Sequence, residues 1–377
     1  MIWLGLAACL AWAVLLLGRG MFWLGRETDA VDAPEPTIWP AVTIIVPARD
    51  EAQTIGATVA SLLAQDYPGP LRLVVVDDRS SDGTGALARA EGDGRLLVVH
   101  GGTRPPGWTG KLNALRQGLA AVAGEAHTHI LLTDADIVHD RDSLRLLVAR
   151  ALAHDLDLVS LMARLRCESP AERWLVPAFV FFFQMLYPFR WSNDPGARTA
   201  AAAGGCVLLR RATLEARGGL APIAGRIIDD CALARLIKHA GPARGRTWLG
   251  LTERVRSLRA YPDVAAIRVI VARTAYAQLG YSPLLLAGMV AAMALVFLAP
   301  PLLAILGTGW ARALGALAWG AMALGFAPML RRFGLSPWRG LALPLVAGAY
   351  LLFTLDSARA EWQGRGGLWK GEPLSRT

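Results

Sequence analysis

Residues 131–140 read LLTDADIVHD, and this stretch decides how the chain is expected to fold. The apolar run through Ile130, Leu131 and Leu132 has the composition of a buried strand. It is followed by two carboxylates, Asp134 and Asp136, with a single residue between them. In α/β sheets, ligands bind at the carboxyl ends of the strands. The stretch therefore predicts a strand that ends in a site.

Three earlier parts of the chain repeat the pattern of an apolar strand followed by a helix. Residues 42–46, 71–76 and 95–100 are short runs of β-branched and aliphatic residues, and stretches with helical spacing follow them. We expect Pro47 to stop the first strand, because proline cannot donate a ladder hydrogen bond. With residues 128–138 as the fourth strand, this alternation predicts an α/β fold with a mostly parallel sheet.

Acidic residues come directly after three of these strands. Asp50 and Glu51 follow the first, Asp78 follows the second, and Asp134 and Asp136 follow the fourth. Taken alone, an Asp-x-Asp pair is more often a solvated turn. Because the carboxyl ends of parallel strands share one edge of a sheet, we expect these carboxylates to form a site. Two carboxylates beside a diphosphate suit Mg²⁺ or Mn²⁺, which prefer oxygen ligands.

Two further segments carry charge at the start of a predicted helix. In residues 107–115, GWTGKLNAL, Lys111 and two glycines suit a phosphate group but lack the P-loop spacing. In residues 225–241, Asp229 and Asp230 open an amphipathic helix. Acidic residues at that position commonly stabilise the helix dipole, and a general base is the functional alternative.

Several long segments carry no charged residue, and the whole chain is 54% hydrophobic with a mean hydropathy of +0.38. The uncharged runs are residues 1–18, 274–311, 313–330 and 340–355. Because a membrane-spanning helix needs about 20 apolar residues, we expect one N-terminal span near 2–24 and two or three C-terminal spans. The expected C-terminal spans are 283–306, 310–330 and 339–356. No basic residue precedes the N-terminal run, which favours an uncleaved anchor over a signal peptide.

The segment 174–191, WLVPAFVFFFQMLYPFRW, is rich in aromatic residues. It is either a core helix or a helix in the membrane interface, and its flanking Trp and Arg favour the interface. Residues 27–40 are rich in proline and acid and predict a linker.

The net charge of +9 comes with arginines beside the apolar spans, which fits the positive-inside rule and contact with anionic headgroups. These arginines include Arg254, Arg256, Arg259, Arg268 and Arg273. No zinc spacing or aromatic-rich basic platform supports nucleic-acid binding. Four scattered cysteines indicate a reducing compartment. The six histidines show no metal-ligand spacing, and we expect His127 and His129 in a loop before the fourth strand.

Six segments in this order resemble the family 2 glycosyltransferases with a GT-A fold. They are VPARDE, VVDDRSSDGT, GWTGKLNAL, TDADIV, AAAGGCVLLRR and IIDDCALARLIKHAG, and together they cover about residues 40–245. Within that family, GWTGKLNAL, the region RVRSLRAYPD and the apolar flanks are similar to the hopene-associated (HpnB-type) enzymes.

The resemblance implies a role for each matching residue. Nucleotide and donor binding falls to Pro47, Asp50, Glu51, Asp78, Lys111 and Asp134. The metal falls to Asp136 and Asp134, and the catalytic base to Asp230. The acceptor side falls to Gly204, Gly205, Cys206 and Asp229. Asp50 stands where the family more often has Asn, and Asp229 where it has Glu. The QxxRW motif of processive members has no counterpart here, which favours a single transfer.

The resulting expectation is a metal-dependent, inverting and non-processive glycosyltransferase in a bacterial inner membrane, with its catalytic domain in the cytoplasm. It would move one sugar from a nucleotide-sugar, with Asp78 favouring uridine, to a lipid hydroxyl such as that of a hopanoid. Alternatives are another lipid acceptor (polyprenyl phosphate, carotenoid or glycerolipid), a nucleotidyltransferase, or a non-catalytic membrane scaffold. The expected domains are an anchor at 1–26, a GT-A domain at 38–275, membrane helices at 276–357 and a tail at 358–377.

Overall fold

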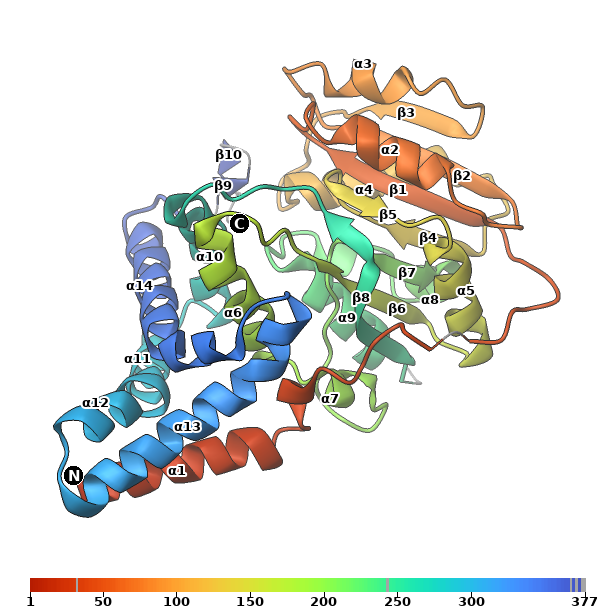
Figure 1. Ribbon diagram of the computed structural model, residues 1–377. Coiled ribbons are helices and arrows are strands. Elements are labelled where there is room, and N and C mark those ends of the chain that lie inside the picture. Colours follow the sequence, from red (N-terminus) through yellow and green to blue (C-terminus); the bar gives the residue numbers. More distant parts are fainter. Residues whose placement is uncertain (32, 242–243, 367, 370–371, 374–377) are drawn as a thin grey trace. The chain divides into compact units, whose positions relative to one another are not determined.

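The computed structural model describes residues 1–31, 33–241, 244–366, 368–369 and 372–373, and it contains two compact units (Figure 1). One unit comprises residues 1–26, 167–190 and 260–367, and the other comprises residues 27–166, 191–259 and 368–377. Each unit is thus assembled from segments that are far apart along the chain. The unit that contains residues 27–166 holds the sheet and is called the sheet unit; the other is called the apolar unit.

In the sheet unit, the described residues form one mixed sheet with the strand order β3-β2-β1-β4-β7-β6-β8-β5. The strands are β1 Val42–Ala48, β2 Leu71–Asp77, β3 Leu96–His100, β4 His129–Leu132, β5 Ile137–His139, β6 Leu158–Arg164, β7 Val207–Arg210 and β8 Thr247–Ser257. Strands β1 to β4 pair in parallel, whereas β7 runs antiparallel to both β4 and β6, and β5 runs antiparallel to β8. A short pair, β9 Leu368–Trp369 and β10 Glu372–Pro373, is antiparallel. The expected mostly parallel α/β sheet is confirmed.

Helices cover both faces of this sheet. Those of the sheet unit are α2 Ile55–Leu63, α3 Thr84–Arg89, α4 Gly110–Ala121, α5 Ser143–Ala153, α8 Arg211–Ala216, the 3₁₀ helix η2 Ala221–Ile223 and α9 Asp229–His239, and α7 Phe189–Asn193 lies where the chain enters the unit. Buried residues of α2 and α5 pack with one set of strand side chains, and those of α4 and α9 pack with the alternate set. In β1, for example, Ile44 belongs to the first core and Ile45 to the second. Both faces of the strands are therefore buried, which explains their continuous apolar runs.

Two predictions about strand ends are wrong. Pro47 does not stop the first strand, because β1 continues to Ala48. Strand β4 pairs with β1 only as far as Ile45, so a missing donor at Pro47 costs no ladder hydrogen bond on that side. His129 lies not in a loop but at the buried start of β4, where it pairs with Val42.

The apolar unit is built from helices. They are α1 Ile2–Leu17, η1 Phe22–Leu24, α6 Pro170–Leu186, α10 Val264–Gln278, α11 Pro283–Met293, the π-helical turn η3 Ala294–Leu298, α12 Ala299–Leu306, α13 Gly309–Arg332, η4 Pro337–Ala342 and α14 Leu343–Trp362. Within the described residues, three helical stretches are long and apolar enough to cross a membrane: Pro283–Leu306, Gly309–Arg332 and Pro337–Trp362. They coincide closely with the three expected C-terminal spans. The last one extends into the predicted tail at 358–377, of which residues 367, 370–371 and 374–377 lie outside the described part.

The N-terminal helix is shorter than expected. It ends at Leu17 rather than near residue 24, because Gly18 terminates it and Gly20 follows with a positive φ of 66°. Sixteen residues rise about 24 Å, less than the roughly 30 Å of a bilayer core. This helix is apolar but is not of spanning length.

Helix α6 contains most of the aromatic segment 174–191. The ring of Phe181 is fully buried and packs against Phe22 and Phe326, at centroid distances of 5.3 and 5.1 Å. The ring of Phe182 packs against Phe297 and Tyr350. This face of the helix is therefore a core contact of the apolar unit, although Trp174 on the same helix is 42% exposed.

The predicted linker at 27–40 is partly ordered against the sheet. Thr28 forms a parallel bridge with Leu251, and the Glu27 carbonyl accepts a hydrogen bond from the Leu251 amide at 2.8 Å. Asp29 accepts a hydrogen bond from the hydroxyl of Thr252. The linker prediction is thus wrong for residues 27–29, which run along β8.

Candidate active site

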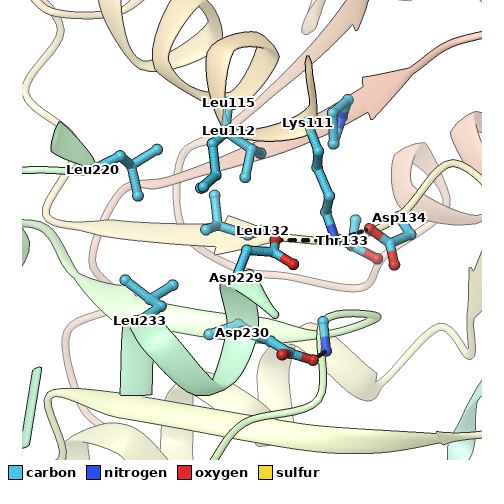
Figure 2. A pocket seen from close by; sticks show the side chains of 13 residues that line it. Lys111, Leu112, Leu115, Leu132, Thr133, Asp134, Leu220, Asp229, Asp230 and Leu233 are labelled. Carbon is cyan, nitrogen blue, oxygen red and sulfur yellow. Dashed lines mark hydrogen bonds and ion pairs between the residues drawn. The ribbon is translucent and has the colours of Figure 1, made fainter. Parts of the chain in front are cut away.

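A pocket at the carboxyl ends of β1 and β4 gathers polar residues from four separate parts of the sheet unit. It encloses about 340 Å³ of space that opens to solvent, and its polar lining consists of Lys111, Thr133, Asp134, Gly204, Asp229 and Asp230. Figure 2 shows Lys111 extending from α4 toward Asp134, with Asp229 and Asp230 approaching from the start of α9. Pro47 and several leucines complete the wall. The pocket thus brings together six of the predicted site residues, which are Pro47, Lys111, Asp134, Gly204, Asp229 and Asp230.

Lys111 is the positive centre of this pocket. Its Nζ lies 2.8 Å from Asp134 Oδ1 and 3.3 Å from Asp229 Oδ2. Thr109 caps helix α4, accepting a hydrogen bond from the Leu112 amide at 3.3 Å, and this cap fixes the turn that carries Lys111. Burial alone would lower the pKa of Lys111, but the charges of Asp134 and Asp229 outweigh it and raise the pKa. The ammonium therefore stays charged.

Asp230 is held as a hydrogen-bond acceptor beside that ammonium. Its Oδ2 accepts from the Gly204 amide at 2.9 Å, and its Oδ1 accepts from the Cys231 amide at 2.7 Å. Desolvation raises the pKa of Asp230 to about 6, the charge of Asp229 adds to the rise, and Lys111 opposes it. The group is thus ionised at neutral pH yet binds a proton more readily than an ordinary aspartate. Both properties suit a general base.

The glycine at position 204 keeps this arrangement compact. A Cβ there would lie 3.2 Å from Lys111 Nζ and 3.4 Å from Asp230 Oδ2. Gly205 and Cys206 lie differently from the residues that line the pocket. The Gly205 carbonyl accepts a hydrogen bond from Thr133 Oγ1 at 2.7 Å, and Cys206 is a fully buried core thiol. Of the three residues assigned to the acceptor side at 204–206, only Gly204 lines the pocket.

Asp136 does not line this pocket. Its carboxylate forms an ion pair with the guanidinium of Arg259. The Arg259 guanidinium donates to Asp136 Oδ2 at 2.7 Å through Nε and to Glu51 Oε1 at 2.6 Å through Nη2. Burial raises the pKa of Asp136, and Arg259 partly offsets the rise. Two acids that follow different strands are thus joined by one arginine.

Arg259 is the site residue that the sequence did not reveal. It was grouped with other arginines as a contact for anionic headgroups, but four of these, Arg254, Arg256, Arg259 and Arg268, have acidic partners within the chain. Arg254 lies 3.3 Å from Asp142, and Arg256 donates to Asp140 at 2.7 Å. Arg254, Arg256 and Arg259 lie within one six-residue segment, RVRSLR, so spacing alone could not distinguish them. Of these three, Arg259 is the one that contacts Asp136, in the turn between β4 and β5.

The nucleotide-binding candidates Asp50 and Asp78 lie where two loops are bound to each other. Asp50 Oδ1 accepts from the Ser81 amide at 2.8 Å, and the Asp78 amide donates to the Ala48 carbonyl at 2.8 Å. Asp50 has a φ of 49°, a left-handed conformation that aspartate tolerates better than most residues. Asp78 is 1% exposed and lies 3.8 Å from the guanidinium of Arg49. The loops after β1 and β2 therefore form one joined surface.

A divalent cation fits the Asp-x-Asp turn if a diphosphate supplies its remaining ligands. Among the described residues, no group of three or more His, Cys, Asp and Glu side chains is arranged to hold a metal by itself. However, each carboxylate of the turn already binds a protein cation, Lys111 on Asp134 and Arg259 on Asp136. Both positions thus favour positive charge, and Mg²⁺ or Mn²⁺ commonly combines one or two carboxylates with phosphate oxygens.

The sheet and the helices that cover it have the GT-A fold. Residues 43–218 match the model of glycosyl transferase family 2. This segment includes every predicted site residue except Asp229 and Asp230, and strand β8 lies outside it. Arg259 also lies outside it.

Two similar proteins are both named as glycosyl-group transferases, and their names differ. The chain is 28% identical over 192 residues to an N-acetylglucosaminyltransferase of Mesorhizobium japonicum, covering 48% of this chain and 42% of that one. It is 35% identical over 97 residues to a 4,4'-diaponeurosporenoate glycosyltransferase of Staphylococcus aureus, covering 26% and 24%. The chain thus spans less than half the length of these relatives.

A solved structure resembles almost the whole chain. It is a mannosyltransferase from Pyrobaculum calidifontis in complex with GDP-mannose and Mn²⁺, with a TM-score of 0.56 and 24% identity. The likeness covers 95% of this chain and 99% of that one. At this identity the likeness concerns the fold.

Proposed function

We propose that the protein is a membrane-bound, inverting and non-processive glycosyltransferase that moves one sugar from a nucleotide-sugar to a lipid hydroxyl. The observation that carries this proposal is the meeting of Lys111, Asp134 and Asp230 in one pocket at the carboxyl ends of the strands. These residues come from α4, from the turn after β4 and from α9. A non-catalytic scaffold would not require a carboxylate with a raised pKa beside a half-buried ammonium.

The loops after β1 and β2 carry the residues that we propose bind the nucleotide of the donor. The Asp78 carboxylate suits an N–H of a nucleobase edge, which favours uridine, while Asp50 and Glu51 suit a ribose or base. Lys111 would bind the diphosphate, because an ammonium and the amides at a helix N-terminus are good phosphate partners. A divalent cation held by Asp136 and Asp134 would neutralise charge on the departing diphosphate. The mannosyltransferase with the similar fold binds GDP-mannose and Mn²⁺, so a purine base is the alternative.

The transfer itself needs one base and one displacement. Asp230 takes the proton from the acceptor hydroxyl while the oxygen of that hydroxyl attacks the anomeric carbon of the donor sugar. The bond from that carbon to the phosphate oxygen breaks, and the nucleoside diphosphate leaves with the bonding electrons. The Gly204 and Cys231 amides hold the carboxylate so that it faces the acceptor throughout. Because a single displacement inverts the carbon, one carboxylate base is sufficient.

A lipid acceptor is supported by the three apolar helical stretches and by the exposed apolar side chains on them, such as Leu284, Leu302 and Leu345. The carotenoid-related substrate named for the staphylococcal relative is another apolar molecule. A hopanoid acceptor depends on the HpnB-type resemblance alone, and the relatives above do not carry that name. Polyprenyl phosphate, carotenoid and glycerolipid acceptors belong to the same proposal, as does an inner-membrane location with the sheet unit in the cytoplasm.

The experiment is a matrix of donors and acceptors. Detergent-solubilised protein is incubated with radiolabelled UDP- and GDP-sugars and a bacterial lipid extract, and labelled lipids are separated by chromatography. We expect one donor to label one lipid class, and we expect Asp230→Asn to abolish the labelling. The exposed Asp155, which pairs with Arg210, provides Asp155→Asn as a matched control. Labelling of no lipid, or undiminished labelling by Asp230→Asn, would contradict the proposal.

A further inference from the structure

Arg259 follows strand β8, more than 100 residues along the chain from the Asp-x-Asp turn, and binds the second carboxylate of that turn. Arg259 bridges Asp136 and Glu51 through two different nitrogens, at 2.7 and 2.6 Å. The two carboxylates are mostly enclosed, with 11% and 13% of their side chains exposed, whereas the Arg259 side chain is 35% exposed. The cation is therefore the member of this cluster that an incoming anion can reach.

Backbone pairing fixes this contact. Strand β5 begins directly after Asp136 and pairs with the end of β8, where Ile137 lies opposite Ser257. The Leu258 amide then donates to the Asp136 carbonyl at 2.7 Å. The next residue is Arg259, so its side chain starts from a backbone that is bound to the turn it neutralises. Arg256, three residues earlier, pairs with Asp140 instead.

We propose that Arg259 is a positioning residue that keeps the donor-free turn closed to a free divalent cation, so that metal and nucleotide enter together. This inference rests on the proposed function, in which the turn holds a metal-bound nucleoside diphosphate. In the donor-free state, the guanidinium satisfies both Asp136 and Glu51. A metal ion that binds Asp136 alone must displace the guanidinium and break that ion pair.

A metal-bound diphosphate removes that cost in two ways. Its oxygens complete the coordination of the cation, and its charge gives the guanidinium a new partner, because arginine binds phosphate as well as carboxylate. Lys111 has the equivalent position on Asp134, and it too can turn to a phosphate. When the donor binds, Lys111 and Arg259 would thus move from the two carboxylates of the turn to phosphate oxygens, and the divalent cation would take their place on the carboxylates.

The test measures Mn²⁺ binding directly, by calorimetry and by the loss of the free Mn²⁺ electron paramagnetic resonance signal, with purified full-length protein. We expect wild type to bind Mn²⁺ alone weakly, and Arg259→Gln to bind it at least about tenfold more tightly, because charge-assisted hydrogen bonds of this kind contribute that much. Arg259→Lys should be intermediate, since an ammonium keeps the charge but lacks the planar fork with which the guanidinium donates to the two carboxylates through separate nitrogens. Arg256→Gln is the matched control and should behave like wild type.

Adding saturating UDP distinguishes the inference from the function on which it rests. With UDP present, wild type should bind Mn²⁺ tightly, and its difference from Arg259→Gln should shrink. Equal affinities of wild type, Arg259→Lys and Arg259→Gln for Mn²⁺ alone would overturn the inference and leave the proposed function intact. If Arg259→Gln fails to fold, Arg259→Lys decides the test. An affinity of Arg259→Lys for Mn²⁺ alone that is higher than that of wild type would support the inference, and an equal affinity would overturn it. Absence of Mn²⁺ binding with UDP or GDP in every variant would instead contradict the metal-dependent function.

Discussion

At the scale of single residues, the site depends on one lysine that neutralises several acids. Lys111 contacts Asp134 and Asp229 directly, and its charge also acts on Asp230. Burial and the negative charges of neighbouring acids both raise the pKa of a carboxylate. Lys111 and Arg259 limit that effect, and Asp230 retains a moderate rise in pKa.

That rise predicts how the proposed transfer depends on pH. Because the base acts in its ionised form, kcat/KM should fall as the pH drops through about 6, the pKa of Asp230. The nearby charge of Asp229 raises this pKa, so Asp229→Asn should move the acidic limb to lower pH. Rates of transfer between pH 4.5 and 8 would measure it. A limb that stays at the same pH in Asp229→Asn, or is absent in wild type, would contradict the assignment.

Some candidate site residues could be predicted because their chemistry conflicts with their surroundings, whereas Asp230 fits its helix start and was assigned through the family resemblance. Asp134 and Asp136 are acids at the end of an apolar strand, and Lys111 is a cation at a helix N-terminus, where the dipole opposes it. Arg259 has no such conflict in the sequence. Its role arises because β5 and β8 pair across more than 100 residues, which local spacing cannot reveal.

At the scale of helices and strands, the first turn of α4 is the element that places the site cation. Thr109 is buried and caps that turn through its hydroxyl, two residues before Lys111. The same turn is joined to a distant loop, because the Thr109 amide donates to the Ala224 carbonyl at 2.8 Å. A change at the cap is thus expected to affect both stability and the lysine.

Thr109→Ala should lower the stability of the protein by about 1 kcal/mol, the usual loss when a helix cap is removed. It should also reduce transfer several-fold, because Lys111 loses its fixed starting point. Thr109→Ser keeps the hydroxyl and should restore both. Thermal unfolding in detergent and initial rates measure the two effects, and equal stability of the Ala and Ser variants would contradict the capping role.

The first half of the sheet follows from sequence and the second half does not. Strands β1 to β4 alternate with helices and read directly as parallel strands, whereas β7 is inserted between β4 and β6, and β5 follows β8 at the edge. This order depends on long-range antiparallel pairing, for which the chain carries no local signal such as a hairpin turn. The end of the first strand was predicted wrongly for a related reason. Whether Pro47 interrupts the hydrogen bonding of β1 depends on where the neighbouring strand β4 ends.

At the scale of the whole molecule, two units interleave along one chain. The apolar unit comprises residues 1–26, 167–190 and 260–367. Its three long apolar helical stretches were predicted within a few residues, because runs without charge are the strongest signal that a sequence gives. The role of α6 was less readable, since core and interfacial helices share an aromatic composition.

The apolar helices predict how the full-length protein fractionates. It should sediment with membranes, stay there after washing with high salt or alkaline carbonate, and dissolve only in detergent. Apolar insertion survives both washes, whereas attachment through basic patches is lost in salt. Immunoblots of each fraction measure this, and release by salt alone would mean that the helices do not insert.

The central claim is that carboxylates from separate segments form one donor site in which Asp230 is the base. The most direct measurement compares Asp230→Asn with wild type in two assays, nucleotide-sugar binding by calorimetry and sugar transfer to lipid. Removal of a general base predicts transfer reduced by roughly 10²- to 10⁴-fold while donor affinity stays close to that of wild type. Transfer that continues at the wild-type rate in Asp230→Asn would contradict the account.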